Sequence, residues 1–391
     1  MKLIAKKNFL SLSGFIFIII FLSSCASIAS MKFWESEDVE NDEPRLLKSF
    51  TEKESLSIDW IQSFEGKNKL GNFEPSFASG KVFFADAKGT IRSLDPESGQ
   101  INWTISSANE FSSGIVAGFN ILAIADVNGN ISLYDQDSGQ LKWITNVKGE
   151  VLSAPAVSAR FIIVKTGSGE LIALDKNSGD IKWSYRSKLP TLTIRGSSSP
   201  VIIDNEVYAS FDNGRIGVFD LDSGFPKWDG AISYVGGSSE LESLIDSDSS
   251  PVIDDAYIYA ANFQGNLTIF DKAQKRAVWQ SEASSFYAPL LVKGLIVLVE
   301  TNSSFKTFFN KGLQESWSLD EYQNRDLSNP VSFGGYIVVG DLDGYIHLIN
   351  PLNGQTIGRK KISKHAIKTL ISRSKNFYAV DESFNLYSLS I

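Results

Sequence analysis

The sequence predicts an all-β fold: an eight-bladed β-propeller of four-stranded antiparallel blades, with the last blade closed by an N-terminal strand. Three observations predict it. A turn motif recurs with a period near 40 residues, short β-like runs separate successive copies, and an incomplete final copy is completed by a segment near the N-terminus. Such a period is typical of radial or stacked repeats, so it overrides the two or three domains that 391 residues would otherwise suggest.

The repeat unit is clearest at residues 133–143, where Leu-Tyr-Asp-Gln-Asp-Ser-Gly ends four residues later in a tryptophan. The tryptophans of successive copies are spaced 40, 40, 45, 51 and 38 residues apart; they are Trp103, Trp143, Trp183, Trp228, Trp279 and Trp317. We expect the aspartate to accept backbone hydrogen bonds within its turn. We expect each tryptophan to pack between adjacent blades, since a large ring buries much apolar surface.

Four short β-like runs fill each repeat, as at residues 154–157, 161–164, 171–174 and 181–183. Glycine-containing turns such as residues 126–130 join the second and third runs and suit hairpins that need positive φ angles. No long helical periodicity is present in the sequence. Four strands in about 40 residues indicate a propeller blade. A β-solenoid is the alternative, but its coils usually repeat at shorter periods.

Ring closure is predicted from the two ends of the repeat region. The last copy stops at Ile391 after its third strand, without a fourth strand or a tryptophan. Residues 57–61 carry the missing fourth-strand pattern, including Trp60. Pairing these ends removes the free edges of an open sheet. Counting third strands from Ile91 to Ser388 gives eight blades.

Composition and motifs exclude several kinds of site. A formal net charge of -8 disfavours nucleic acid as a partner, and the single cysteine, Cys25, excludes a disulfide framework or thiolate metal site within the chain. The two histidines, His347 and His365, are too few for a metal cluster and are expected to be polar surface or strand residues. Residues 341–344 could begin a calcium loop, but Leu352 occupies its twelfth position, so a hairpin is predicted. We expect no catalytic residues, metal or cofactor.

The N-terminus predicts an export signal over residues 1–24. Lysines precede an apolar run at residues 15–22, as in a secretion signal. Residues 22–25, Leu-Ser-Ser-Cys, resemble the bacterial lipobox, which implies lipid modification of Cys25. A transmembrane anchor is the alternative, although the apolar run is short for a span of about 20 residues. Several acyl chains on Cys25 would anchor the protein durably.

The segment after Cys25 sets the expected location and domain boundaries. Ala26, not aspartate, follows the cysteine, which in the lipoprotein sorting rule favours the outer membrane, with the protein body facing the periplasm. Residues 25–55 lack the repeat and carry an acidic run, so we predict a lipidated cysteine followed by a flexible acidic tether. The eight-bladed propeller is assigned to residues 56–391.

The Leu-Asp-x-x-Ser-Gly-x-x-x-Trp repeat resembles the blade of quinoproteins, also called the PQQ-like repeat, and not the WD repeat. Two families with this blade need to be separated. Pyrroloquinoline quinone (PQQ) alcohol dehydrogenases use a vicinal cysteine pair and a calcium ion, and this chain has only one cysteine. The other is the BamB family, lipoproteins of the outer-membrane β-barrel assembly (BAM) machinery.

Two insertions interrupt the repeat. The interval from the repeat tryptophan to the proline of the next first strand is 12 residues after Trp143, 17 after Trp183 and 23 after Trp228. Both insertions fall between a fourth strand and the next first strand, so they are expected on one face in neighbouring blades. Repeat proteins often carry such insertions on their binding face.

These insertions resemble the two loops with which members of the BamB family bind BamA. The first matches a Pro-x-Leu-x-Leu-Arg-Gly pattern at Leu192, Ile194 and Arg195, with Ile194 in place of leucine, and the second matches an Asp-x-Asp pattern at Asp246 and Asp248. The resemblance implies these five residues as partner-binding residues. In the alternative, Leu192 and Ile194 tuck under their loop and Arg195 pairs with Asp246 or Asp248 within the chain.

The resemblance also implies partners and a function. The expected partners are the periplasmic POTRA domains of BamA, other BAM components and unfolded outer-membrane proteins, together with the membrane through the lipid anchor. The expected function is that of a non-enzymatic scaffold that assists the folding and insertion of β-barrel proteins. The alternatives are a PQQ-dependent dehydrogenase-like enzyme and a propeller that binds another envelope component.

Overall fold

A computed structural model describes residues 42–67, 71–189, 198–234 and 249–391. These residues form strands, turns and connections, and within these ranges there is no helix that could cross a membrane. The chain divides into a segment ending at Glu43 and a compact unit from Pro44 to Ile391, to which the following description applies.

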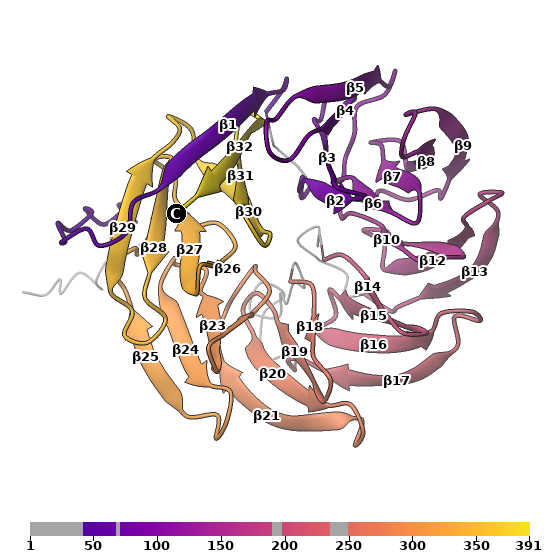
Figure 1. The fold of residues 1–391 in the computed structure, drawn as a ribbon. Helices are drawn as coiled ribbons and strands as arrows, with labels where there is room; N and C mark the ends of the chain where they lie inside the picture. Colours follow the sequence, from indigo (N-terminus) through magenta and orange to yellow (C-terminus); the bar gives the residue numbers. More distant parts are fainter. Residues whose placement is uncertain (1–41, 68–70, 190–197, 235–248) are drawn as a thin grey trace, which may run out of the picture. The chain divides into compact units, whose positions relative to one another are not determined.

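The compact unit is a ring of eight sheets, each with four antiparallel strands (Figure 1). Blade 1 contains β2 (Ser76–Ala78), β3 (Lys81–Ala85), β4 (Thr90–Leu94) and β5 (Ile101–Ser106). Blade 2 contains β6 (Val116–Gly118), β7 (Ile121–Ala125), β8 (Asn130–Asp135) and β9 (Leu141–Asn146). Blade 3 contains β10 (Ala156–Val157), β11 (Phe161–Lys165), β12 (Glu170–Asp175) and β13 (Ile181–Arg186). Blade 4 contains β14 (Val201–Ile203), β15 (Glu206–Phe211), β16 (Arg215–Asp220) and β17 (Pro226–Ala231).

The second half of the ring repeats this order. Blade 5 contains β18 (Val252–Ile253), β19 (Tyr257–Ala261), β20 (Asn266–Asp271) and β21 (Arg276–Glu282). Blade 6 contains β22 (Leu290–Val292), β23 (Leu295–Val299), β24 (Phe305–Phe309) and β25 (Glu315–Leu319). Blade 7 contains β26 (Val331–Phe333), β27 (Tyr336–Gly340), β28 (Tyr345–Ile349) and β29 (Thr356–Lys361). Blade 8 contains β30 (Ile367–Ser372), β31 (Phe377–Asp381), β32 (Asn385–Ser390) and β1 (Ser57–Ser63). The predicted eight-bladed fold is confirmed.

The ring closes in blade 8, where the first and last strands of the propeller pair. β1 runs antiparallel to β32, with Ile58 opposite Leu389 and Ser63 opposite Asn385. In Figure 1 the indigo β1 lies beside the yellow β32. The predicted closure by an N-terminal fourth strand is therefore confirmed.

The hydrophobic core lies between adjacent blades. The second and third strands of each blade are buried over most of their length, because both of their faces are covered by neighbouring blades. One core cluster, for example, joins Leu133 of blade 2 to Ile162 and Ile172 of blade 3. Another joins Phe84 of blade 1 to Val380 of blade 8, so the two ends of the repeat region share one core cluster.

The repeat motif is a local turn. In blade 2, Asp135 Oδ1 accepts hydrogen bonds from the backbone N–H of Asp137 at 3.1 Å and from the N–H of Ser138 at 3.0 Å. The Ser138 hydroxyl also donates to the same oxygen, and these donors, first among them the Ser138 N–H, lower the pKa of Asp135. The prediction that this aspartate is a turn acceptor is confirmed.

The same motif also joins neighbouring blades. The Trp143 indole N–H donates to the carbonyl oxygen of Lys176 at 2.9 Å, within the Asp-x-x-Ser-Gly turn of blade 3. The Trp183 indole likewise donates to Leu221 O in blade 4 at 3.0 Å. A tryptophan and the glycine of the next turn pack closely, so the predicted inter-blade position of the tryptophans is confirmed.

We expect Gly179→Ala to lower the free energy of unfolding by more than Gly294→Ala. The two glycines have nearly equal φ angles, 77° and 78°, so the backbone strain of an alanine, about 1–2 kcal/mol, is matched. A Cβ at Gly179 would lie 2.8 Å from Trp143 Cδ2, whereas one at Gly294 would meet no atom within 4 Å. Overpacking should add about 1–3 kcal/mol at Gly179. Urea unfolding of both variants measures the difference, and equal losses would contradict the tryptophan–glycine contact.

Candidate partner-binding face

Strand direction divides the turns of the propeller between two faces. Because neighbouring strands are antiparallel, the hairpins between second and third strands lie at the same end of the blades as the connections between blades. We call this end the connection face. The opposite end carries the first-to-second and third-to-fourth turns and is called the turn face.

The predicted partner-binding residues belong to two connections on the connection face. Leu192, Ile194 and Arg195 fall between β13 and β14, and Asp246 and Asp248 fall between β17 and β18; all five lie outside the described residues. The predicted lipidation residue Cys25 also lies outside them.

The described ends of these two connections are joined to each other. The backbone N–H of Ser199, just before β14, donates to the hydroxyl of Ser250, just before β18, at 2.9 Å. Asn213, in the hairpin of blade 4, donates through Nδ2 to Ser187 Oγ at 3.0 Å and to Lys188 O at 2.9 Å. The two insertions therefore end at neighbouring, mutually bonded positions.

Aspartates in the second-to-third hairpins fix the connections at the base of this face. Asp126 Oδ1 accepts the N–H groups of Asn128 and Asn130, which closes its own hairpin. Its Oδ2 accepts the side-chain amide of Asn109, from the preceding connection, at 2.6 Å. In blade 8, Asp381 Oδ2 similarly accepts the hydroxyl of Ser363 at 2.7 Å. These buried carboxylates have a structural role, because their hydrogen bonds keep the connections in place.

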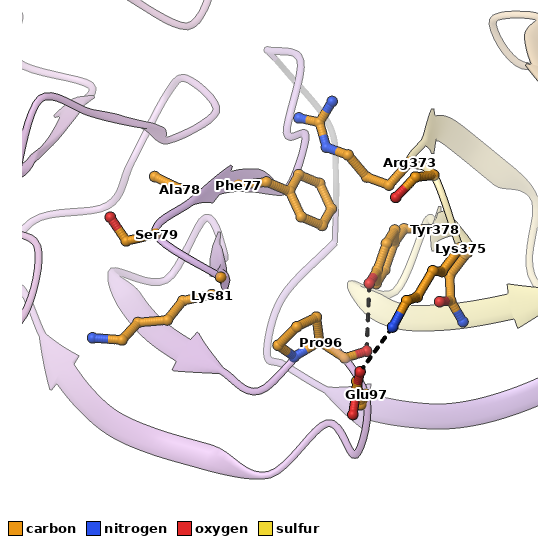
Figure 2. A pocket seen from close by; sticks show the side chains of 12 residues that line it. Phe77, Ala78, Ser79, Lys81, Pro96, Glu97, Arg373, Lys375 and Tyr378 are labelled. Atoms are coloured by element: carbon orange, nitrogen blue, oxygen red, sulfur yellow. Dashed lines mark hydrogen bonds and ion pairs between the residues drawn. The ribbon is translucent and has the colours of Figure 1, made fainter.

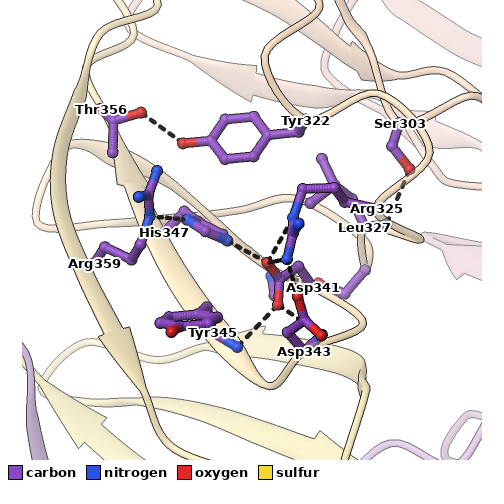
Figure 3. Close-up of polar contacts among 12 residues, drawn as sticks. Ser303, Tyr322, Arg325, Leu327, Asp341, Asp343, Tyr345, His347, Thr356 and Arg359 are labelled. Atoms are coloured by element: carbon purple, nitrogen blue, oxygen red, sulfur yellow. Dashed lines mark hydrogen bonds and ion pairs between the residues drawn. The ribbon is translucent and has the colours of Figure 1, made fainter. Parts of the chain in front are cut away.

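The corresponding aspartate of blade 7 belongs to a buried charged network (Figure 3). Arg325, from the connection before β26, donates to Asp341 Oδ2 through Nε at 3.0 Å and Nη2 at 2.8 Å, and it also pairs with Asp343. His347 on β28 lies 2.9 Å from the same oxygen through Nε2. Arg359 on β29 donates from Nε to His347 Nδ1 at 3.0 Å.

The hydrogen bonds determine the protonation of this network. Because the guanidinium of Arg359 can only donate, Nδ1 of His347 carries no proton, and Nε2–H donates to Asp341. Burial lowers the pKa of His347, which agrees with a neutral ring. Burial opposes the ionisation of Asp341, but its hydrogen bonds and the nearby Arg325 hold its pKa below the ordinary value.

The structure also places the predicted features of blade 7. Residues 341–344 form the β27–β28 hairpin, as predicted. His347 lies on a strand, which was one of the two expected settings, but its complete burial and its charged neighbours were not predicted. The sequence signal that could have indicated this contact was the spacing of Asp341 and His347 across one hairpin.

A segment before β1 crosses blade 7, and we call residues 44–56 the leader strap. Arg325 Nη1 donates to Arg45 O at 2.9 Å, and Arg359 Nη1 donates to Lys48 O at 2.9 Å. The N–H of Lys53 donates to Ile357 O on β29 at 2.8 Å. The propeller contacts thus begin well before residue 56, where the repeat pattern placed the boundary, because the leader strap makes them without carrying the motif.

A cavity of about 400 Å³ lies on the turn face where blade 8 meets blade 1 (Figure 2). The Arg373 guanidinium lies over the Phe77 ring at 4.3 Å, and Phe77 packs on Tyr378 with ring centroids 4.7 Å apart. Lys375 pairs with Glu97 at 3.2 Å, and the Tyr378 hydroxyl donates to Pro96 O at 3.4 Å. Burial lowers the pKa of Arg373 and raises that of Tyr378. These contacts join the two blades at the closure of the ring.

The described residues do not fit the cofactor set of a quinoprotein dehydrogenase. No group of three or more His, Cys, Asp or Glu side chains among them is arranged to hold a metal ion. The vicinal cysteine pair cannot form either, because the sequence contains one cysteine.

The sequence profile of the family described as "Outer membrane protein assembly factor BamB" matches residues 87–318. A protein of this name from Pseudomonas aeruginosa is 40% identical over 327 residues, which cover 83% of this chain and 86% of that relative. The chain belongs to the BamB family. The crystal structure of BamB from Moraxella catarrhalis has a TM-score of 0.80 and 25% identity, and the match covers 86% of this chain and all of the other.

Quinoprotein dehydrogenases share the fold with the BamB family. Quinohemoprotein alcohol dehydrogenase from Comamonas testosteroni has a TM-score of 0.70 but only 11% identity, with 85% of this chain and 76% of that chain covered. This likeness concerns the fold alone. Two families carry this blade, and the chain belongs to the BamB family, which is the non-enzymatic one.

Proposed function

We propose that this chain is a non-enzymatic scaffold of the outer-membrane β-barrel assembly machinery. In this proposal it binds the periplasmic POTRA domains of BamA, associates with other BAM components and assists the folding and insertion of β-barrel proteins. The observation that carries the proposal is membership in the BamB family, through a profile match over residues 87–318 and a relative of 40% identity.

The proposed location is the periplasmic side of the outer membrane. A signal peptide over residues 1–24 would direct export, and lipid on Cys25 would anchor the mature chain. The lipobox at residues 22–25 and the Ala26 that follows it support this part of the proposal.

The proposed contact with BamA uses Leu192, Ile194 and Arg195, with Asp246 and Asp248 in the neighbouring connection. Two apolar side chains beside an arginine form a compact anchor of the kind that contributes most of the binding energy in many interfaces. The two carboxylates can orient the arginine or pair with basic groups of the partner. The bonded ends of the two connections support a shared site, because Ser199 and Ser250 hold them side by side.

Unfolded substrates are proposed to add to the outer edges of the blades as extra strands. Each fourth strand has one unpaired edge within its sheet. The leader strap already bonds to β29 at Ile357, so blade 7 is the least available edge among the described strands.

Replacing Leu192 and Arg195 together by alanine is expected to weaken binding to the periplasmic domains of BamA by about a hundredfold, because the central anchor is removed. Isothermal titration calorimetry with the purified domains measures the affinity. Phe225→Ala is the control, since Phe225 is 70% exposed in the β16–β17 turn on the opposite face. Unchanged affinity of a folded double variant would refute the loop assignment.

A further inference from the structure

Three aromatic side chains are carried by neighbouring, mutually bonded segments around blade 5 on the connection face, and we call Tyr234, Phe263 and Phe286 the aromatic platform. Tyr234 follows β17 and is 80% exposed, and Phe286 lies in the connection before β22 and is 36% exposed. Phe263 lies in the β19–β20 hairpin and stacks on Phe286, with ring centroids 4.8 Å apart and planes 11° apart. Exposed aromatic groups of this kind mark interaction surfaces more often than single exposed residues do.

Hydrogen bonds from both sides fix the hairpin that carries Phe263. The Ser233 hydroxyl donates to Asn262 Oδ1 at 2.7 Å and accepts the N–H of Asn266 at 2.8 Å. On the other side, the N–H of Gln264 donates to Ser284 Oγ at 2.9 Å. The three segments that carry the platform are thus bonded to one another. A surface ordered in advance loses little conformational entropy when a partner binds.

A polar groove of about 500 Å³ adjoins the platform at Tyr234. Its lining includes two carboxylates, Glu282 and Glu300, and one ammonium, Lys306. Lys306 Nζ donates to the backbone oxygen of Glu282 at 2.8 Å. The groove therefore has an excess of negative charge.

The sequence that follows Tyr234 is also acidic. Residues 235–248, which continue the chain from Tyr234, contain four acidic side chains and no basic one. Acidic groups and exposed aromatic rings together suit lysine or arginine side chains, which form ion pairs with carboxylates and cation–π contacts with rings.

We infer that the aromatic platform and its acidic groove form a second contact with the protein partner that binds the neighbouring insertions, and that this contact takes up basic side chains of the partner. The inference rests on the proposed function, because it places the partner on the connection face. The platform supplies apolar area, and the groove selects a partner surface that carries lysine or arginine. Tyr234 lies directly before the 235–248 insertion, so the two contacts are continuous in the chain.

The test uses the full chain and the purified periplasmic domains of BamA. Tyr234→Ala combined with Phe286→Ala is expected to weaken binding at least tenfold, because two exposed rings are lost at a fixed site. Phe119→Ala is the matched control: this ring is 54% exposed in the β6–β7 turn on the turn face, and its loss is expected to change the affinity less than twofold. Urea unfolding shows whether the double variant keeps the stability of the parent chain.

Charge reversal tests the groove separately. Glu282→Lys is expected to slow association by at least threefold at low salt, with a smaller effect at high salt, because surface charges act mainly on the encounter of the partners. Glu315→Lys is the control, because it changes net charge equally at the turn-face end of β25. Equal effects of the two reversals would overturn the groove assignment.

The outcomes separate this inference from the proposed function. If the Leu192/Arg195 variant loses binding and the platform variant binds normally, the platform inference is overturned and the proposed function stands. If both variants bind normally, both assignments are overturned. Loss of binding in both variants, with normal binding of Phe119→Ala, supports the inference.

Discussion

Trp60→Ala is expected to lower the free energy of unfolding by about 3–5 kcal/mol, the usual cost of removing a buried tryptophan from a core. Trp60 on β1 is 8% exposed and packs in the core cluster shared by blades 8 and 1. Its indole N–H donates to Pro96 O in blade 1 at 3.0 Å. A Cβ at Gly99 would lie 2.6 Å from its ring. The substitution therefore weakens the strand that closes the ring and its contact with the next blade.

Trp143→Ala provides the matched control within the same chain. Trp143 makes the equivalent hydrogen bond at 2.9 Å and packs on the equivalent glycine, but it lies in blade 2, whose four strands are continuous in sequence. Trp60→Ala should lower the urea midpoint further, because β1 is held in blade 8 by pairing with β32 and is distant from it in sequence. Equal midpoints would show that ring closure adds nothing to the contribution of this tryptophan.

Arg325→Ala is expected to destabilise the protein by about 3–5 kcal/mol, because it leaves the buried carboxylate of Asp341 without its cationic partner. Asp341 is fully buried, and a neutral His347 cannot compensate its charge. The variant also loses the hydrogen bond from Arg325 to the backbone oxygen of Arg45. Urea unfolding measures the stability, and hydrogen exchange should show faster exchange in the leader strap.

Two comparisons identify the cause of that loss. Adding Asp341→Asn to Arg325→Ala removes the uncompensated charge and should recover part of the stability. Lys375→Ala breaks an ion pair whose two side chains are each 79% exposed and should change the stability little. A loss in Arg325→Ala no larger than that of Lys375→Ala would contradict the role assigned to the buried network.

The fold was predictable because its main signal is local and repeated. The bonds within each Asp-x-x-Ser-Gly turn span two or three residues, as at Asp135, so the motif itself specifies the turn. The tryptophan that follows has the same position in seven of the eight blades, with Gly358 there in blade 7, and the missing fourth strand of the last copy identified β1. Repetition thus compensated for the weak signal of each short strand.

The leader strap and the blade 7 network were not predictable in the same way. Arg325 and Arg45 are 280 residues apart in the sequence. Their contact uses a backbone oxygen, which every residue carries, so no sequence motif in the leader strap predicts it. The aromatic platform has rings on two connections and one hairpin, and one of them, Phe286, lies outside any repeated position. The predicted loop residues stay predictions, since they lie outside the described ranges.

The leader strap has a mechanical consequence. A force that pulls the chain at Pro44 acts first on the Arg45–Asp320 ion pair of 2.7 Å and on the bonds that hold Arg45 O and Lys48 O. β1 follows the leader strap in the chain, so tension reaches it only after these contacts yield. The leader strap therefore transfers the pulling force to blade 7. The pairing of β1 with β32, which closes the ring, is protected from that force until the leader strap detaches.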